Sequence, residues 1–278
     1  MSMTQATIIA VYFFSILCAK FTGAKLRMIS KNQIKHISSL HQKKFRKELG
    51  LFIAETPKVV DEFLHSAIKI TEIYGVEEWI QKNISKLHCE HHIVTEAELS
   101  RITALQTPNQ VLAVCQQPVF LDSSIDTTAD LFLYLDGVAD PGNMGTIIRM
   151  ADWFGIKQIF CSEKCADIFN PKVVQSTMGS LTRVKVFYKT LSEVVHHTKV
   201  KHLLGADLNG ENLYSAKFPE RSILIIGSEA HGISSENQKL LTNHITIPQA
   251  NASKTESLNA AVATSIILAE LFRQGRIN

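Results

Sequence analysis

The sequence predicts an α/β protein with a small N-terminal domain and a C-terminal domain built on a parallel sheet. Short apolar runs alternate with helical patterns along the chain, an order of elements typical of α/β domains. The chain has 278 residues, of which 45% are hydrophobic and 20% charged, enough to build two cores. The polar stretch QQPVFLDSSIDTTAD predicts a linker at 118–130, between a domain of residues 28–117 and one of residues 131–278.

In the first domain, the pattern predicts a basic amphipathic helix from Ser30 to about Glu48. Its apolar anchors are Ile34, Ile37, Leu40 and Phe45. Further along, apolar runs bounded by turn residues predict the strands, and amphipathic segments between them predict helices. The expected strands are 51–55, 69–75, 91–95 and 111–117, and the expected helices are 56–66, 77–83 and 96–104.

The basic helix holds a cluster of positive charge that the net charge of +3 does not reveal. Between Met28 and Ile53, six basic residues stand against one acid, Glu48. The six are Lys31, Lys35, Lys43, Lys44, Arg46 and Lys47. Two interpretations stay open: a solvated helix face, or an electrostatic footprint for the phosphates of a nucleic acid.

Residues 1–27 are predicted to be a non-native or disordered extension. The run ATIIAVYFFSILCAKF is also typical of a signal sequence or short membrane anchor, but it lacks a basic segment before it. It is shorter than the about 20 residues that a membrane helix needs. We favour a misplaced start codon, because Met28 opens the basic helix. No other stretch is long and apolar enough to span a membrane, and we expect a cytoplasmic protein.

Five cysteines at irregular positions predict reduced thiols and not a disulfide framework. Cys161 and Cys165 form a C-x-x-x-C pair without a second pair to complete a zinc site. The residues of the other candidate cluster alternate between the two faces of a strand, so few of them could share one ion. They are His88, Cys89, His91 and His92. We expect no metal.

In the second domain, continuous apolar runs predict buried parallel strands. They lie at 131–136, 157–162, 183–188, 202–207, 222–228 and 244–249. Three of these strands are followed by a stretch of polar residues and glycines or by a polar loop. Ligands of α/β proteins bind at the carboxyl ends of strands, so these three segments are candidate sites.

The first segment is DPGNMGTIIRMADWFG (140–155), in which a helix follows the strand. Asn143 lies near the start of this helix, where it can cap the helix or contact a ligand. Arg149 stands one turn beyond Gly145 on the same face, and its planar guanidinium suits an anion such as a phosphodiester. An ordinary capped helix with a surface arginine is the alternative.

The second segment is LIIGSEAHGIS (224–234). Gly227 and Gly232 let the backbone approach a ligand, and Glu229 can serve as an acid, a base or a hydrogen-bond acceptor. A turn glutamate that caps the next helix is the alternative. The third segment, within residues 245–272, is a polar loop that ends in Ser257-Leu258-Asn259 and opens a long helix. Ser257 alone would be an ordinary helix cap. The helix is apolar around most of its circumference, so we expect it to be buried, against another subunit.

Together, N-x-G-x-x-x-R, G-S-E-x-x-G and I-P-x(8)-S-L-N resemble the motifs of the SpoU/TrmH group of SPOUT RNA 2′-O-ribose methyltransferases, over Leu131 to Arg273. The segment KKFRKELGLFIAETPKVVDEFL resembles the substrate-binding domain that many members carry. Most members have E-G where this chain has Glu55-Thr56. A nucleotide-dependent dehydrogenase would need G-x-G-x-x-G after an early strand, and that motif is missing.

The resemblance implies a C-terminal trefoil knot, a rare exception among folds, a homodimer, and S-adenosylmethionine as the cofactor. It implies cofactor binding by Gly227, Gly232, Ile247, Gln249 and Leu258. It assigns the catalytic positions to Asn143, Arg149, Glu229, Ser257 and Asn259, with Arg149 on the RNA side. If the basic helix is an electrostatic footprint, Lys43, Lys44, Arg46 and Lys47 contact the RNA. The implied substrate is ribosomal RNA, with transfer RNA second. The alternative is a non-catalytic RNA-binding homologue.

Overall fold

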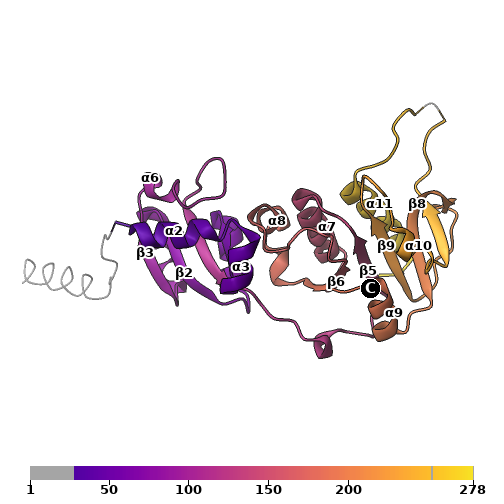
Figure 1. The fold of residues 1–278 in the computed structure, drawn as a ribbon, viewed down its shortest axis with the longest axis horizontal. Helices are drawn as coiled ribbons and strands as arrows, with labels where there is room; N and C mark the ends of the chain where they lie inside the picture. Colours follow the sequence, from indigo (N-terminus) through magenta and orange to yellow (C-terminus); the bar gives the residue numbers. More distant parts are fainter. Residues whose placement is uncertain (1–27, 252, 278) are drawn as a thin grey trace, which may run out of the picture.

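The computed structural model describes residues 28–251 and 253–277, which form two sheets joined by an extended connection (Figure 1). The prediction of a non-native or disordered extension falls on residues 1–27 and lies outside this part. Within the part described, no helix combines the length and apolar character needed to cross a membrane.

The N-terminal sheet has the strand order β1-β4-β2-β3. Strand β4 runs antiparallel to β1 and β2, and β3 runs parallel to β2. The strands are β1 (Leu51–Glu55), β2 (Ile70–Gly75), β3 (Glu90–Ile93) and β4 (Val111–Gln116). The helices are α2 (Lys31–Ser39), α3 (Lys43–Leu49), α4 (Pro57–Leu64), α5 (Glu77–Asn83), η1 (Ile84–Lys86) and α6 (Glu96–Leu99). The predicted strands are confirmed with small shifts at their ends.

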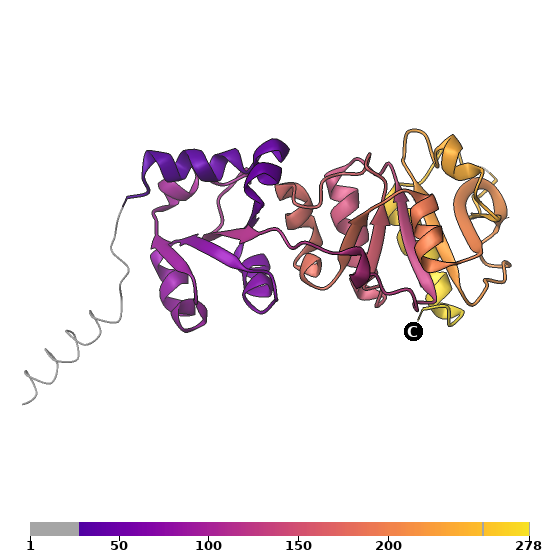
Figure 2. The same cartoon turned by 60° about the horizontal axis from the view of Figure 1, so that its bottom comes forward.

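Both faces of this sheet are covered, as the alternation of side chains along a strand requires. In β1, Phe52 and Ala54 join the apolar cluster on the side of α4 and α5, whereas Ile53 joins the cluster on the side of α2 and α6. Figure 2 shows α2 and α3 in indigo along one face of the sheet. Because no face is left open, the sheet is the middle layer of its domain.

The prediction of one helix from Ser30 to Glu48 is wrong, because the helix is interrupted between α2 and α3. Leu40, at the end of α2, is fully buried, and the backbone carbonyls of Leu40 and His41 each accept a hydrogen bond of 2.9 Å from Nη1 of Arg46. A side chain from the second helix therefore satisfies carbonyls that the end of the first leaves open.

Thr56, between β1 and α4, has a backbone conformation that is unfavourable for a β-branched residue. Its φ is 76° and its ψ is 146°, close to a region that glycine alone occupies freely. The preceding Glu55 is buried and accepts hydrogen bonds from the Thr103 hydroxyl and from the backbone N–H of Ala104, the latter at 3.0 Å. Burial raises the pKa of Glu55. Thr56 therefore follows a fixed buried side chain and has little freedom to relax.

The C-terminal sheet has the strand order β10-β8-β9-β5-β6-β7, and every neighbouring pair is parallel. The strands are β5 (Leu131–Asp136), β6 (Gln158–Cys161), β7 (Lys185–Tyr188), β8 (His202–Asn212), β9 (Ser222–Gly227) and β10 (Asn243–Thr246). The helices are η2 (Asp122–Ser124), in the connection, and α7 (Pro141–Trp153), α8 (Pro171–Thr177), η3 (Ser180–Thr182), α9 (Leu191–Thr198), α10 (Ser235–Gln238) and α11 (Ala260–Arg273). The buried faces of α7, α8 and α11 share one apolar cluster, and α9 joins the cluster on the opposite face.

The chain changes direction between the adjacent strands β5 and β9. After β5 it continues to β6 on one side, and after β9 it continues to β10 on the other. Asp136 and Gly227 are paired at the carboxyl ends of these strands. In open parallel sheets the connections diverge at such a point and leave a crevice for ligands. The topology therefore places the candidate site at the ends of β5 and β9.

We predict that Thr56→Gly raises the stability of the protein. Glycine removes the conformational strain at φ 76°, and Thr56 makes no side-chain capping bond that would be lost. The expected gain is about 1 kcal/mol, or about 2–4 °C in the midpoint of thermal unfolding.

Thr95→Gly is the matched control, because Thr95 has an ordinary φ of −76° and caps α6 through Glu98. The same substitution there should lower the unfolding midpoint. An unfolding midpoint for Thr56→Gly at or below the wild-type value would show that Thr56 is not strained.

Candidate active site

A cavity of about 450 Å³ lies beside the carboxyl ends of β9 and β10. Its volume falls in the range of about 300–1,000 Å³ that is usual for small-molecule and cofactor sites. All five residues predicted to bind a cofactor line it, together with Glu229 and Ser257. The five are Gly227, Gly232, Ile247, Gln249 and Leu258. Segments far apart in the sequence therefore meet at one ligand-sized space.

A tight backbone hairpin forms one wall of the cavity. Ser228 and Gly232 exchange two backbone hydrogen bonds, of 3.0 and 2.9 Å, and Gly232 has a φ of 64°. A Cβ atom on Gly227 would lie 2.2 Å from the carbonyl carbon of Gly232, closer than any real contact. Glycine at position 227 is therefore required for this hairpin to close.

The remaining walls combine apolar side chains with a folded polar loop. The Gln249 side chain donates hydrogen bonds to Ser253 Oγ at 3.0 Å and to the Thr255 carbonyl at 2.6 Å, and so holds the loop beside the cavity. Several apolar residues and one acid that line the same space were not predicted from the sequence. These residues are Ala206, Asp207, Leu208, Ile226, Ile233, Ile245 and Ile267. Their apolar side chains resemble those of any buried strand or helix, and Asp207 in the long strand β8 was the one visible signal.

Next to the cavity, three of the predicted catalytic residues form a single hydrogen-bonded cluster. Glu229 Oε1 accepts bonds of 2.7 Å from the side-chain amides of both Asn143 and Asn259, and one of 3.1 Å from the backbone N–H of Ala260. The Asn259 amide also donates to Asn143 Oδ1 at 2.8 Å. The cluster thus connects the start of α7, the loop after β9 and the start of α11.

Helix capping positions two members of this cluster. Asp140 accepts a hydrogen bond from the backbone N–H of Asn143 at 2.8 Å and caps α7. Asn259 Oδ1 accepts from the backbone N–H groups of Ala261 and Val262, at 3.0 and 3.2 Å, and caps α11. Asn259 therefore uses its oxygen to start a helix and its amide to hold the site.

The structure does not bring Arg149 and Ser257 into the cluster. Arg149 is one turn beyond Gly145, whose absent Cβ would lie 2.5 Å from Ser176 Cβ of α8. The Arg149 side chain is exposed, and no hydrogen bond or ion pair connects it to another residue of the described chain. Ser257 is exposed at the cavity. Both side chains are accessible to a large ligand from solvent.

The prediction that Arg46 contacts RNA is wrong, whereas Lys43, Lys44 and Lys47 are exposed on α3. The Arg46 side chain is 2% exposed, and its Nη2 lies 2.6 Å from Asp167 Oδ2 in the C-terminal domain. Its guanidinium donates hydrogen bonds to that carboxylate and to the carbonyls at the end of α2. A group already bonded inside the protein is not available to a phosphate.

Asp136 is a site-supporting residue that the sequence reasoning missed. It is buried at the end of β5, and its Oδ2 accepts bonds of 2.8 Å from the Ser234 backbone and from the Asn237 amide. It thereby fixes the segment that follows the glycine hairpin. The acid that ends the apolar run LFLYLD was the signal that could have identified it.

Across residues 28–251 and 253–277, no group of three or more His, Cys, Asp or Glu side chains is placed to hold a metal ion.

Comparison with known proteins gives consistent matches over both domains. Residues 130–269 match the SpoU rRNA Methylase family, and residues 31–113 match the MRM3-like substrate binding domain. The chain is 31% identical over 246 residues to the 23S rRNA (guanosine(2553)-2′-O)-methyltransferase RlmP of Bacillus subtilis, a match that covers 87% of this chain and 97% of the relative.

Solved structures agree with this match. A TrmH-family protein from Porphyromonas gingivalis superposes with a TM-score of 0.77 at 36% identity, over 88% of this chain and 98% of its own. An AdoMet-bound rRNA methyltransferase from Sinorhizobium meliloti superposes with a TM-score of 0.76 at 28% identity, over 89% of this chain and 97% of its own. The similarity extends over both sheets and is not limited to the second.

We predict that Asn259→Ala destabilises the protein more than Asn259→Ser does. Both substitutions remove the amide that bonds to Glu229 and Asn143, but serine keeps an oxygen that can cap α11. The expected difference is about 1 kcal/mol in the free energy of unfolding, the usual contribution of a helix cap. Denaturant unfolding measures it, and equal losses for the two variants would show that the cap contributes nothing.

Proposed function

Because the chain belongs to the SpoU rRNA methylase family, we propose that it methylates a ribose 2′-hydroxyl of ribosomal RNA with S-adenosylmethionine as the donor. The observation that carries the proposal is the meeting of the three motifs. Asn143, Glu229 and Asn259 form one cluster, and the predicted cofactor residues line the cavity beside it. The relatives from B. subtilis and S. meliloti are described as rRNA methyltransferases, which favours ribosomal over transfer RNA.

The cavity fits S-adenosylmethionine in its size and its lining. The hairpin at Gly227 and Gly232 presents backbone groups where a side chain would fill the space, and apolar strand residues offer a surface for a flat base. Gly227, Ile247 and Leu258 would hold the cofactor, with Gly232 and Gln249 beside them. When bound, the cofactor supplies an electrophilic methyl group.

The residues of the cluster would position the ribose, since a hydroxyl is a poor nucleophile and alignment is most of the task. Glu229 Oε1 is saturated by three donors, so this oxygen acts as an anchor for Asn143 and Asn259. Ser257, exposed at the same cavity, would complete the polar wall on the ribose side.

Arg149 would act from the RNA side. A guanidinium keeps its proton throughout the physiological pH range and is a poor base, so a role in binding is favoured over proton removal. Its planar fork would bind the phosphate next to the target ribose and lower the pKa of the attacking hydroxyl. The exposure of Arg149 supports this role.

Three lysines of α3 would bind the RNA backbone at a distance from the chemistry. Lys43, Lys44 and Lys47 are exposed on one short helix of the N-terminal domain. Phosphate contacts of this kind supply affinity without reading sequence. The match of residues 31–113 to a substrate binding domain supports the assignment.

We also propose a homodimer that forms through the C-terminal domain. Trp153 at the end of α7 is 81% exposed, and Val262 and Phe272 on α11 are 48% and 54% exposed. Phe154 lies 5.8 Å from the Phe272 ring and connects the two helices. Large exposed apolar side chains on neighbouring helices are typical of a protein interface.

The resemblance implies two further features. The segment after β10 would be threaded into a trefoil knot, and the contacts of α11 with both α7 and β9 support that path. An experimental structure traced through residues 225–260 tests it. The cellular location would be the cytoplasm, where fluorescence of a tagged full chain would report it.

We predict that Gly227→Ala abolishes binding of S-adenosylmethionine. The added Cβ would collide with the Gly232 backbone and force the hairpin open. Isothermal titration without added metal should give a binding isotherm for the wild type and none for the variant. Thr56→Gly, in the other domain, is the control and should bind normally. A wild-type protein that is folded and binds neither the cofactor nor its demethylated product would refute the assignment.

For Arg149, we expect Arg149→Ala to bind S-adenosylmethionine normally and to lose methyl transfer by about a hundredfold, because the target ribose loses its alignment. Arg149→Lys keeps the charge but loses the planar fork, so it should restore little. Single-turnover rates with rRNA from a strain lacking the gene measure both. A wild-type rate in Arg149→Ala would remove the residue from the mechanism.

For assembly, light scattering of the wild type should give about twice the chain mass of 31.0 kDa. Trp153→Asp should shift the mass to that of one chain, because a charge would be buried in the interface. A wild-type monomer that still methylates RNA would contradict the dimer.

A further inference from the structure

We propose that Arg46 and Asp167 are a positioning pair, which sets the distance between the RNA-binding lysines of α3 and the catalytic cluster and so selects the nucleotide that is methylated. The inference rests on the proposed function. It assigns no chemistry to the pair, which touches neither the cofactor cavity nor the catalytic cluster. Instead, it explains why a cation in the middle of a basic helix is directed into the protein.

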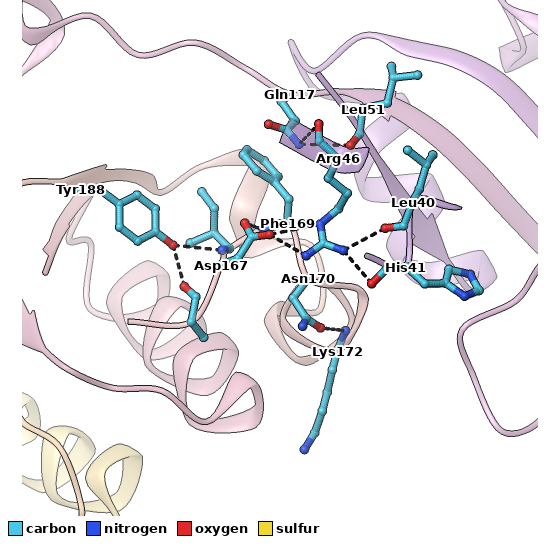
Figure 3. A network of polar contacts seen from close by, with 12 residues as sticks. Leu40, His41, Arg46, Leu51, Gln117, Asp167, Phe169, Asn170, Lys172 and Tyr188 are labelled. Carbon is cyan, nitrogen blue, oxygen red and sulfur yellow. Dashed lines mark hydrogen bonds and ion pairs between the residues drawn. The ribbon is translucent and has the colours of Figure 1, made fainter. Parts of the chain in front are cut away.

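The contacts of Arg46 connect three segments (Figure 3). Nε and Nη2 donate to Asp167 Oδ2 at 3.1 and 2.6 Å, and Nη1 donates to the carbonyls of Leu40 and His41. The backbone carbonyl of Arg46 accepts from the Gln117 side chain at 3.0 Å. One residue therefore ties the end of α2, the start of the interdomain connection and the C-terminal domain together.

On the other side, Asp167 belongs to a segment with well-defined contacts. The Tyr188 hydroxyl donates to the Ala166 carbonyl at 2.6 Å and accepts from the Ile168 backbone at 3.1 Å. Asp167 Oδ1 accepts from the backbone of Phe169 at 3.1 Å. Figure 3 shows Asp167 and Tyr188 on one side of the Arg46 guanidinium and the carbonyls of Leu40 and His41 on the other. Contacts within its own domain thus fix the position of Asp167 independently of Arg46.

Helix α8 connects the Arg46–Asp167 contact to the candidate active site through its packing. It packs against β1 of the N-terminal domain and against α7, and Figure 1 shows it at the junction of the two domains. The Phe169 ring, just before α8, lies 4.8 Å from the Phe52 ring of β1. Gly145 of α7 lets α8 approach so closely that a Cβ would lie 2.7 Å from the Val173 carbonyl. A shift of α3 at the junction would change its distance to Asn143.

Cations lie on both sides of the pair. Lys43, Lys44 and Lys47 surround Arg46 on α3, and Lys172 at the start of α8 is 65% exposed. The Lys172 amine lies 3.7 Å from Asp140, the capping residue of α7. An RNA strand held by the lysines of α3 would pass Lys172 on its way to Asn143. The fixed spacing of these groups suits one structured RNA and not an arbitrary strand.

A second bridge between the domains offers a matched control. Arg183 pairs with Glu62 of the N-terminal domain at 2.5 Å and with Asp152 of α7 at 2.9 Å. Its side chain is 47% exposed, against 2% for Arg46. Exposed pairs contribute little to structure, whereas a buried pair tolerates only a narrow geometry. The positioning role therefore belongs to Arg46 and not to Arg183.

The test uses the full chain and ribosomal RNA from a strain that lacks the gene. Four proteins are compared with the wild type: Arg46→Lys, the double variant Arg46→Met/Asp167→Leu, Arg183→Met as the control, and Lys43→Ala/Lys44→Ala/Lys47→Ala. The double variant leaves no unpaired buried charge, so we expect it to fold and to be assayed like the wild type. Each protein is assayed for cofactor affinity, for KM and kcat with the RNA, and for the nucleotide methylated.

We expect the Arg46 variants to bind S-adenosylmethionine as the wild type does, to show a KM for RNA about tenfold higher, and to methylate the target less selectively. Arg183→Met should behave as the wild type. The lysine variant should also raise KM, but it should keep the target nucleotide. This difference in selectivity separates positioning from affinity.

The proposal is overturned if folded Arg46 variants methylate the same nucleotide with a KM within about twofold of the wild type, since misplacement should cost more. Loss of cofactor binding in those variants would also overturn it, because the pair would then support the fold of the catalytic domain. If the wild type itself transfers no methyl group, the proposed function fails, and the positioning role, which rests on it, fails with it.

Discussion

One carboxylate oxygen holds the candidate site together. Glu229 Oε1 accepts hydrogen bonds from Asn143, Asn259 and Ala260, which belong to segments up to 86 residues away from it in the sequence. Each hydrogen bond contributes about 1 kcal/mol on its own. Their value lies in the geometry, because they fix the starts of α7 and α11 against the loop after β9. The cavity proposed for the cofactor and the surface proposed for the RNA therefore meet along one edge of the sheet.

Much of this arrangement followed from the sequence, because local patterns determined it. Continuous apolar runs located the parallel strands, and LFLYLD matches the bounds of β5 at residues 131–136. Carboxyl ends of parallel strands share one edge, which brings together the motifs that follow β5, β9 and β10. Asn143, Glu229 and Asn259 do converge, and Gly227 occupies a position that tolerates no side chain. The assembly of this site is a consequence of topology.

Long-range contacts could not be predicted. Arg46 stands among lysines in a basic run, and its partner Asp167 is 121 residues away, so nothing local distinguished it from an RNA-binding residue. The break between α2 and α3 depends on the same side chain. Removing one partner of a buried ion pair costs about 3–5 kcal/mol, because the other charge is left buried and unpaired. Contacts between the domains, such as that of Arg46 with Asp167, thus depend on pairings that periodicity does not record.

The central claim is that this chain methylates ribosomal RNA on a ribose. Mapping 2′-O-methylation across ribosomal and transfer RNA, in a strain lacking the gene and in the same strain carrying it on a plasmid, tests the claim most directly. We expect at least one ribose methyl group of ribosomal RNA to be absent without the gene and to return with it. An unchanged methylation pattern in ribosomal RNA would refute the proposed activity, whether or not transfer RNA changes.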